Sequence, residues 1–130
     1  MVRAQGGDDA VIWDTEKFAK APYSYEVCAK ESGYITFMDT ESCGIASAML
    51  GAGRETKDSE IDFAAGIIIH KKVGDYVEKG ESLATMYASR EELFEAAAKR
   101  YLSAVTQKSA RAEEEKLVYA RVTKEQVEYF

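Results

Sequence analysis

The chain has 130 residues, 46% of them hydrophobic, which suits one domain of ordinary size with a packed core. Its formal net charge of −6 lacks the basic footprint that phosphate-backbone binding requires, so we expect no nucleic-acid partner. Two cysteines and one histidine are too few for a disulfide framework or a four-ligand zinc site. We therefore expect Cys28 and Cys43 to be free, mostly buried thiols in a reducing cytoplasm.

The first part of the chain predicts a short helix followed by two paired strands. Asp14 is placed to cap a helix over residues 14–18. Apolar and polar side chains alternate over residues 23–28, and this period of two predicts a strand. Residues 31–33 have turn chemistry, and the β-branched and aromatic residues 34–38 then predict the hairpin partner of that strand.

A second helix is predicted ahead of a loop that contains glycines. Thr40 or Ser42 is suited to cap this helix. Its apolar face is expected to carry Ile45, Ala48 and Met49. Gly51 follows at a position where a helix end favours a left-handed residue. Residues 51–60 have no apolar side chain larger than alanine, so we expect an exposed, mobile loop.

The next part predicts two strands and the longest helix. Residues 66–72 predict a strand that is buried for most of its length, and residues 83–88 predict another. Residues 73–80 lie between them and predict a compact turn with two glycines. Residues 89–92 match a capping box that opens the longest helix. The apolar stripe of this helix comprises Leu93, Phe94, Ala97, Tyr101, Leu102 and Val105.

The C-terminal part is predicted to be less regular. Charged residues 108–116 predict a solvated connection, residues 117–122 a last strand, and residues 124–130 a helical turn. The chain as a whole is therefore expected to be of the α+β class, with antiparallel strands. No segment has the composition of a linker that would split the chain into two domains, so residues 1–130 are expected to form a single domain.

Candidate catalytic and ligand-binding motifs are incomplete. A general base at His70 would need a nucleophile or an orienting acid that the sequence does not reveal, so a structural role is favoured. Gly51 and Gly53 close a helix, whereas phosphate-binding loops place their glycines ahead of one. The alternating carboxylates of residues 58–62 do not fit a calcium loop, which needs glycine where this chain has Phe63.

Residues 73–80 contain the most distinctive motif. Gly74 and Asp75 suit a tight turn, the two valines are placed to pack inward, and Gly80 turns the chain again. The unit resembles the hammerhead turn of biotinyl and lipoyl carrier domains. Those carriers need an exposed lysine at a hairpin tip, and this chain lacks the tripeptide that would hold it. A non-catalytic hammerhead binding or carrier-like module without that lysine is therefore kept as an alternative.

Six segments stand in a fixed order, namely residues 4–8 (AQGGD), 32–35, 50–54 (LGAGR), 61–67, 72–81 and 83–85. Together they resemble the C-terminal domain of pyrimidine-nucleoside phosphorylase. The sister family thymidine phosphorylase shares much of this pattern. The resemblance covers roughly residues 4–102, and its order and spacing are more specific than any single motif.

The resemblance implies a fold, a parent enzyme and a set of partners. The fold would be an α/β-hammerhead-type domain with a barrel-sandwich-like turn unit, mixed antiparallel strands and one long C-terminal helix. The parent would be a pentosyltransferase of cytoplasmic pyrimidine salvage. It would convert uridine, thymidine or deoxyuridine with phosphate to the free base and (deoxy)ribose 1-phosphate. Such parents are homodimers with a helical domain and an α/β domain, and no membrane or nucleic acid takes part.

The family's catalytic motifs lie upstream of this domain and do not occur in this sequence. We therefore expect no catalytic, cofactor-binding or metal-binding residue here, and no activity of the chain alone. A possible closure loop comprises Gly51, Gly53, Arg54 and Lys57. The structural turns are expected at Gly33, Gly66, Gly74, Asp75 and Gly80. Residues 1–20 are expected to be a linker from the missing α/β domain, and the candidate docking residues are Trp13, Phe18, Tyr23 and Tyr25.

Overall fold

A computed structural model describes residues 1–54, 56–112 and 118–130. Glu55 of the predicted loop and residues 113–117 of the predicted connection and last strand lie outside the described residues. The helices are α1 (Ala10–Trp13), α2 (Thr40–Ser47) and α3 (Phe94–Ala104). The strands are β1 (Tyr23–Cys28), β2 (Gly33–Met38), β3 (Gly66–Ile69), β4 (Tyr76–Val77), β5 (Ser82–Ala88), β6 (Val105–Lys108), β7 (Ala120–Val122) and β8 (Val127–Tyr129). Short helical turns are η1 (Arg3–Gln5), η2 (Thr15–Lys17), η3 (Ala48–Ala52) and η4 (Glu91–Leu93).

The strands form antiparallel sheets, which confirms the α+β class. β5 lies between β1 and β3 in one sheet, β2 lies between β4 and β6 in a second, and β7 pairs with β8. The predicted hairpin of residues 23–28 with residues 34–38 is wrong, because β1 and β2 belong to different sheets. After β1 the chain runs on beside residues 80 and 81. There Ala29 N donates to Glu81 O at 2.9 Å and Gly80 N donates to Ala29 O at 2.8 Å.

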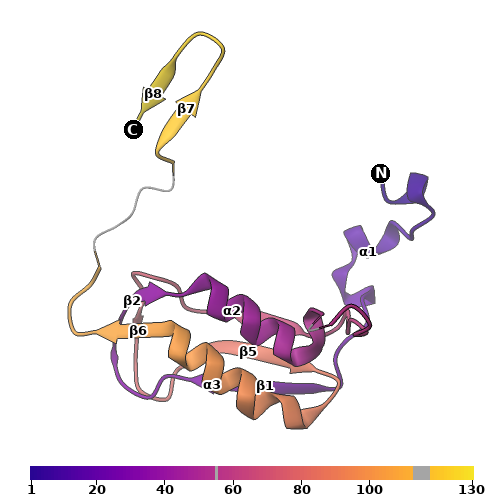
Figure 1. The fold of residues 1–130 in the computed structure, drawn as a ribbon, viewed down its shortest axis with the longest axis horizontal. Helices are drawn as coiled ribbons and strands as arrows, with labels where there is room; N and C mark the ends of the chain where they lie inside the picture. Colours follow the sequence, from indigo (N-terminus) through magenta and orange to yellow (C-terminus); the bar gives the residue numbers. More distant parts are fainter. Residues whose placement is uncertain (55, 113–117) are drawn as a thin grey trace.

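The core gathers side chains from α2, α3 and both three-stranded sheets, since Ile35 of β2 and Val77 of β4 are fully buried together with Leu83 of β5. Figure 1 shows α2 and α3 side by side, with α3 running over β1 and β5. The apolar stripe of α3 is confirmed by the burial of Phe94, Ala97 and Tyr101, but Val105 belongs to β6, a strand that the sequence did not predict. The largest fully buried side chains are Tyr101, Ile35, Leu50, Leu83, Met86, Val27 and Val77.

Two predictions of burial and pairing are wrong at the periphery. β3 is an edge strand, not a buried one, and Ile68 is 53% exposed because β5 is its single neighbour in the sheet. Residues 124–130 contribute β8, not a helical turn, because Val127 pairs back to Val122 across a turn at residues 123–126.

Two helix caps also differ from prediction. Asp39, not Thr40 or Ser42, is the N-cap of α2, and its carboxylate accepts a 2.6 Å bond from the Ser42 hydroxyl. This hydrogen bond is the main cause that lowers the pKa of Asp39. On α2, Ala46 is buried and Ile45 is exposed, so the apolar face is rotated from the predicted one. The capping box at residues 89–92 is absent as a side-chain cap, because the turn η4 precedes α3.

Candidate functional site

Residues 51–54 and 56–60 are here called the glycine loop. Its base is fixed by close backbone packing. Helix α2 continues into η3, where Gly51 has φ +107°, a backbone conformation that favours glycine. A Cβ on Gly51 would lie 3.2 Å from Cβ of Asp62, and Gly51 O accepts a hydrogen bond from Asp62 N at 2.9 Å. A Cβ on Gly53 would lie 3.0 Å from Cβ of Ala48. The two glycines therefore allow the chain after α2 to pass close to Asp62 and Ala48.

Asp62 ties this loop base to two other segments. Its Oδ1 accepts a hydrogen bond from Ala64 N at 3.0 Å, and its Oδ2 accepts one from Ser89 N at 3.2 Å. Hydrogen bonding from the Ser89 side chain is the main cause that lowers the pKa of Asp62. From the sequence, the carboxylates of residues 58–62 were weighed as a calcium site. No pattern in the sequence indicated that Asp62 would bond to Ser89. In the described parts of the chain, no group of three metal-ligating side chains comes together.

The far part of the loop presents two cations to solvent. Thr56 and Ser59 close a small turn, in which Ser59 Oγ accepts a 3.0 Å bond from Thr56 N. Arg54 and Lys57 are exposed, and among the described residues neither forms an ion pair. A pocket of about 310 Å³ lies beside the loop base and is lined by Leu50, Gly51, Glu60, Ile61, Asp62, Ser89, Arg90 and Leu93. The loop thus combines an anchored base with a charged, exposed tip.

The turn at residues 73–80 packs against β2. Asp75 accepts a 2.8 Å bond from Lys72 N through its side chain, and its carbonyl accepts one from Ile35 N at 2.9 Å. Gly74 and Gly80 have φ of +96° and +87°, which side chains other than glycine rarely adopt. Val77 is fully buried, whereas Val73 is 47% exposed, so only one of the two valines packs inward as expected.

Two further glycines named from the sequence have different surroundings. A Cβ on Gly33 would lie 2.9 Å from the carbonyl oxygen of Lys108, so β2 and β6 approach each other closely at this point. A Cβ on Gly66 would meet nothing within 4 Å, and its φ is not positive, so the structure gives no steric reason for glycine there.

His70 has an acidic neighbour that the sequence did not reveal. Its Nε2 lies 2.6 Å from Oγ1 of Thr85, and that hydroxyl donates a 2.6 Å bond to Glu26 Oε1. Since Thr85 donates its proton to the carboxylate, His70 is the donor in the first bond. Hydrogen bonds from Ser82 and then Thr85 lower the pKa of Glu26. The pairing of β1 and β3 with β5 brings these side chains together on one face of the sheet.

The chemistry of this His70 group is limited. Thr85 is buried, whereas His70 and Glu26 are exposed. The imidazole donates to a hydroxyl that is already bonded to a carboxylate, so it does not activate Thr85 as a nucleophile. The expected structural role of His70 therefore fits a polar cross-strand network. Among the cysteines, Cys28 is exposed, which corrects the expected burial, while partial burial and then the Asp39 charge raise the pKa of Cys43.

The comparisons with known proteins agree on one family. The family model described as the pyrimidine nucleoside phosphorylase C-terminal domain matches residues 34–108. The pyrimidine-nucleoside phosphorylase of Bacillus subtilis (strain 168) is 43% identical over 123 residues, which are 95% of this chain and 28% of the relative. The enzyme of that name from Staphylococcus aureus (strain USA300) is 47% identical over 93 residues, 72% of this chain and 22% of the relative.

The chain belongs to the pyrimidine nucleoside phosphorylase C-terminal domain family. It spans about a quarter of the length of these curated relatives. The glycine loop and the turn at residues 73–80 both lie inside the range that matches the family model, whereas α1, β7 and β8 lie outside it. No helix within the described residues of this family member is long and apolar enough to cross a membrane.

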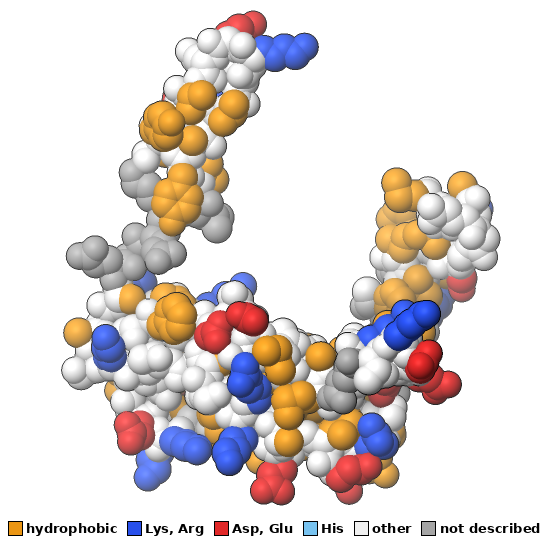
Figure 2. Space-filling view, viewed as in Figure 1, with side chains coloured by type: hydrophobic (Ala, Val, Ile, Leu, Met, Phe, Trp, Pro, Cys, Tyr) orange, Lys and Arg blue, Asp and Glu red, His pale blue; other side chains and the backbone are white. Residues whose placement is uncertain are grey.

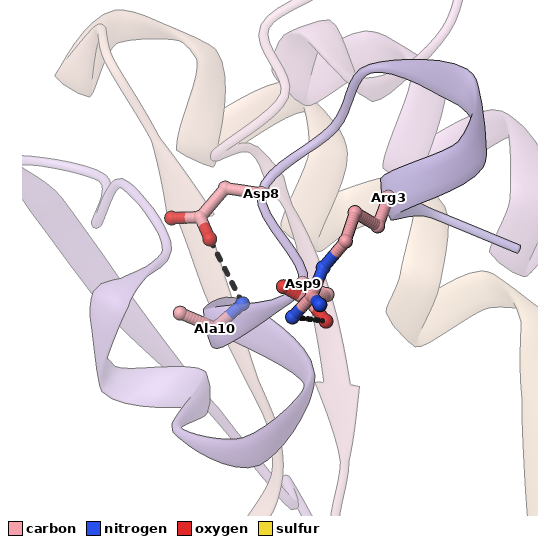
Figure 3. A network of polar contacts seen from close by, with 4 residues as sticks. All are labelled: Arg3, Asp8, Asp9 and Ala10. Carbon is pink, nitrogen blue, oxygen red and sulfur yellow. Dashed lines mark hydrogen bonds and ion pairs between the residues drawn. The ribbon is translucent and has the colours of Figure 1, made fainter.

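The segment ahead of β1 is held by local contacts. In Figure 3, Arg3 pairs with Asp9 at 2.6 Å, and Asp8 Oδ1 accepts a 2.9 Å bond from Ala10 N at the start of α1. Asp14 caps η2 as predicted, by accepting a bond from Glu16 N at 3.2 Å. The candidate docking residues of this family member include Trp13, 86% exposed, with Phe18, Tyr23 and Tyr25 also exposed.

Proposed function

We propose that this chain is the C-terminal structural domain of a pyrimidine-nucleoside phosphorylase. The parent enzyme would catalyse the reversible phosphorolysis of uridine, thymidine or deoxyuridine to the free base and (deoxy)ribose 1-phosphate. The observation that carries the proposal is the 43% identity to the Bacillus subtilis enzyme of that name along 95% of this chain. Since the match occupies 28% of that relative, the parent's substrate sites are assigned to the part outside this chain.

The chain alone is proposed to be inactive. Polar side chains near the glycine loop form hydrogen bonds within the chain. Asp62, for example, accepts bonds from the backbone N–H groups of Ala64 and Ser89. Phosphorolysis needs positioned donors for the phosphate and for the base. The proposal therefore places no catalytic, cofactor-binding or metal-binding residue in this chain. It also places the parent in the cytoplasm as a homodimer that acts in pyrimidine salvage, with a helical and an α/β domain as the partners of this one.

We also propose that residues 1–130 form one domain of the α/β-hammerhead type. The turn at residues 73–80 would be its hammerhead and barrel-sandwich-like unit, supported by the positive φ of Gly74 and Gly80 and the buried Val77. Residues 1–20 would be the linker from the α/β domain, which is consistent with their short helical turns and exposed side chains.

The glycine loop is proposed to close against the opposite lobe of the parent when substrate binds. Its fixed base and exposed cations suit a segment that carries Arg54 to a new partner during closure. In the full-length enzyme, Arg54→Ala should raise the KM for nucleoside several-fold. Lys99→Ala, which removes an exposed cation from α3, is the matched control and should leave KM unchanged. An unaltered KM in Arg54→Ala would remove the closure role.

The exposed aromatic residues near the start of the chain are proposed to dock on the α/β lobe. Tyr25 stacks on Phe94 at a centroid distance of 5.6 Å and is still 46% exposed, so its outer surface is available to a neighbouring lobe. Trp13 is 86% exposed in this chain, and docking would bury its ring, so Trp13→Ala in the full-length enzyme should lower the melting temperature by several degrees. An unchanged melting temperature would contradict this docking role.

The activity itself is tested by phosphate-dependent release of uracil from uridine. The full-length parent and the 130-residue chain are assayed side by side, each with and without phosphate. We expect uracil from the parent only, and only with phosphate. If the parent released no free base from uridine, from thymidine or from deoxyuridine, the proposed enzyme would be overturned. Release by the 130-residue chain would overturn the proposed inactivity of the domain.

A further inference from the structure

The central cross-strand pairs of the β7–β8 hairpin differ between its two faces. Cross-strand partners lie on the same face of an antiparallel pair, and alternate residues of a strand share a face. Ala120 pairs with Tyr129, and Val122 pairs with Val127, so these four side chains form one apolar face, here called the hairpin apolar face. On the opposite face Arg121 pairs with Glu128, and the exposed rings of Tyr119 and Phe130 lie on that face at the open end of the hairpin.

The hairpin apolar face is exposed. Val122 is 73% exposed, Tyr129 is 81% exposed, and Val127 is 50% exposed. Figure 2 shows hydrophobic side chains gathered along the hairpin, away from the body of the molecule. A two-stranded hairpin is at best marginally stable in water, and three or more strands or a packing partner are needed for independent stability. This surface therefore has the properties of one that is buried in a larger assembly.

The register of the hairpin is well defined despite this exposure. Thr123 N donates to Gln126 O at 2.9 Å, and Thr123 Oγ1 accepts a 3.1 Å bond from Gln126 N. This turn fixes which residues face one another, so the apolar residues stay together on one side. The central part of the opposite side carries the charged pair Arg121 and Glu128, which suits contact with water, whereas the central part of the hairpin apolar face carries no charge.

The curated relatives are long enough to supply a surface for the hairpin apolar face. The match to the Bacillus subtilis enzyme spans 123 of the 130 residues, so it includes residues 8–123 wherever it begins. Both α1 and β7 therefore have counterparts in a relative more than three times as long as this chain. Both also lie outside residues 34–108, the range of the domain model. Figure 1 shows that each extends away from the body formed by α2, α3 and β5.

We propose that the hairpin apolar face docks on the part of the parent phosphorylase that lies outside this chain. This inference rests on the proposed function, because it takes its partner from the parent enzyme. The β7–β8 hairpin would then act as a second attachment, separate from the segment that contains α1. Tyr129 and Val122 would supply the buried contact, while Arg121 and Glu128 would remain on the solvent side.

Amide hydrogen exchange tests the proposal without any substitution. Exchange is measured at residues 118–130 in the full-length parent and in the 130-residue chain. We expect these amides to exchange about tenfold or more slowly in the parent, because docking suppresses local opening. Equal exchange in the two proteins would overturn the proposal. Protection that rises with concentration in the 130-residue chain would also overturn it, since the partner would then be a second copy.

Two neighbouring substitutions on opposite faces sharpen the test. In the parent, Tyr129→Ala should abolish the slow exchange and lower the melting temperature by several degrees. Glu128→Ala is the matched control, one residue away on the opposite face, and should change neither. Equal effects of both substitutions would contradict docking through the apolar face.

Uracil release by the same parent preparation separates this inference from the proposed function. Release from uridine without protection of the hairpin would overturn the docking alone. Protection of the hairpin without phosphate-dependent release from any of the three nucleosides would overturn the enzyme assignment. The docking on the rest of the longer chain would in that case be supported.

Discussion

The body of the molecule and its two ends treat apolar side chains in opposite ways. In the body, β5 has a neighbour on each side, and five of its seven residues are buried. At the ends, α1 and the β7–β8 hairpin contain no buried residue, and Trp13 and Tyr129 are more than four-fifths exposed. The body thus supplies its own core, whereas the exposure of both ends is what the proposed docking on the parent enzyme requires.

The glycine loop lies between these two extremes. Its base is packed as closely as a core segment, because a Cβ added to Gly51 would lie 3.2 Å from Cβ of Asp62. Its tip carries exposed Arg54 and Lys57, as the ends carry exposed aromatic rings. Substitutions in the body, at the loop base and at the ends should therefore differ in effect.

The largest effect is expected in the body. Leu83→Ala should lower the free energy of unfolding of the 130-residue chain by about 2–5 kcal/mol, because Leu83 is 1% exposed and its removal leaves a cavity. Val122→Ala, at the end, should change it by less than about 0.5 kcal/mol. Urea unfolding followed by circular dichroism measures both. A loss for Val122→Ala as large as that for Leu83→Ala would break the distinction between body and ends.

The second effect is expected at the loop base. Gly51→Ala should cost roughly 1–3 kcal/mol, because an alanine at φ +107° is strained and its Cβ approaches Asp62. Gly44→Ala is the control: its Cβ would meet nothing within 4 Å, and alanine favours the helix by about 1 kcal/mol. The two Gly→Ala changes should therefore have opposite signs in thermal unfolding. A neutral Gly51→Ala would show that the loop base is not fixed.

Sequence patterns predicted the parts of the body whose signals are local. The strand at residues 83–88 was predicted from its own composition, and the stripe through Phe94 and Tyr101 from helical spacing. The left-handed position at Gly51 followed from a helix end. The predicted partner of β1 was wrong, because turn chemistry at residues 31–33 does not determine which strands pair.

The polar contacts of the candidate site could not be predicted for a related reason. Glu26 and Thr85 are 59 positions apart and meet only because β1 pairs with β5. Asp62 and Ser89 are 27 positions apart and meet where the loop base approaches the turn ahead of α3. Contacts of this kind depend on which strands pair and on how distant segments pack, and the alternation within a single strand does not name its partner.

The third effect separates packing from hydrogen bonding in the body. Tyr101 is fully buried, and its hydroxyl has no hydrogen-bond partner within the described residues. Tyr101→Phe should therefore stabilise the 130-residue chain by about 1 kcal/mol at pH 7 in urea unfolding. A clear loss of stability would instead show that the hydroxyl has a partner.

The same variant carries a pH signature. Burial is the main cause that raises the pKa of Tyr101 to about 12. The unfolded chain then releases this proton first, so the wild type loses stability as the pH rises from about 10 toward 12. Phenylalanine has no proton to release in this range. The stability of Tyr101→Phe relative to wild type should therefore grow by about 1.5 kcal/mol between about pH 10 and pH 11.5. A constant difference across that range would contradict the raised pKa.

The smallest effect is expected where the loop base meets the body. Hydrogen bonds from Ser89 and Ala64 lower the pKa of Asp62, so its carboxylate stabilises the fold above its ordinary pKa and loses this contribution as the pH falls through the lowered value. Asp62→Asn should cost less than about 1 kcal/mol at pH 7, since one amide oxygen still accepts a bond and the site is largely solvated. The difference between wild type and variant should shrink from about pH 5 to about pH 3, because asparagine does not titrate. Asp58→Asn, on the exposed part of the loop, is the control and should show no such convergence. If the two variants behaved alike, the loop base would belong with the exposed ends and not with the body.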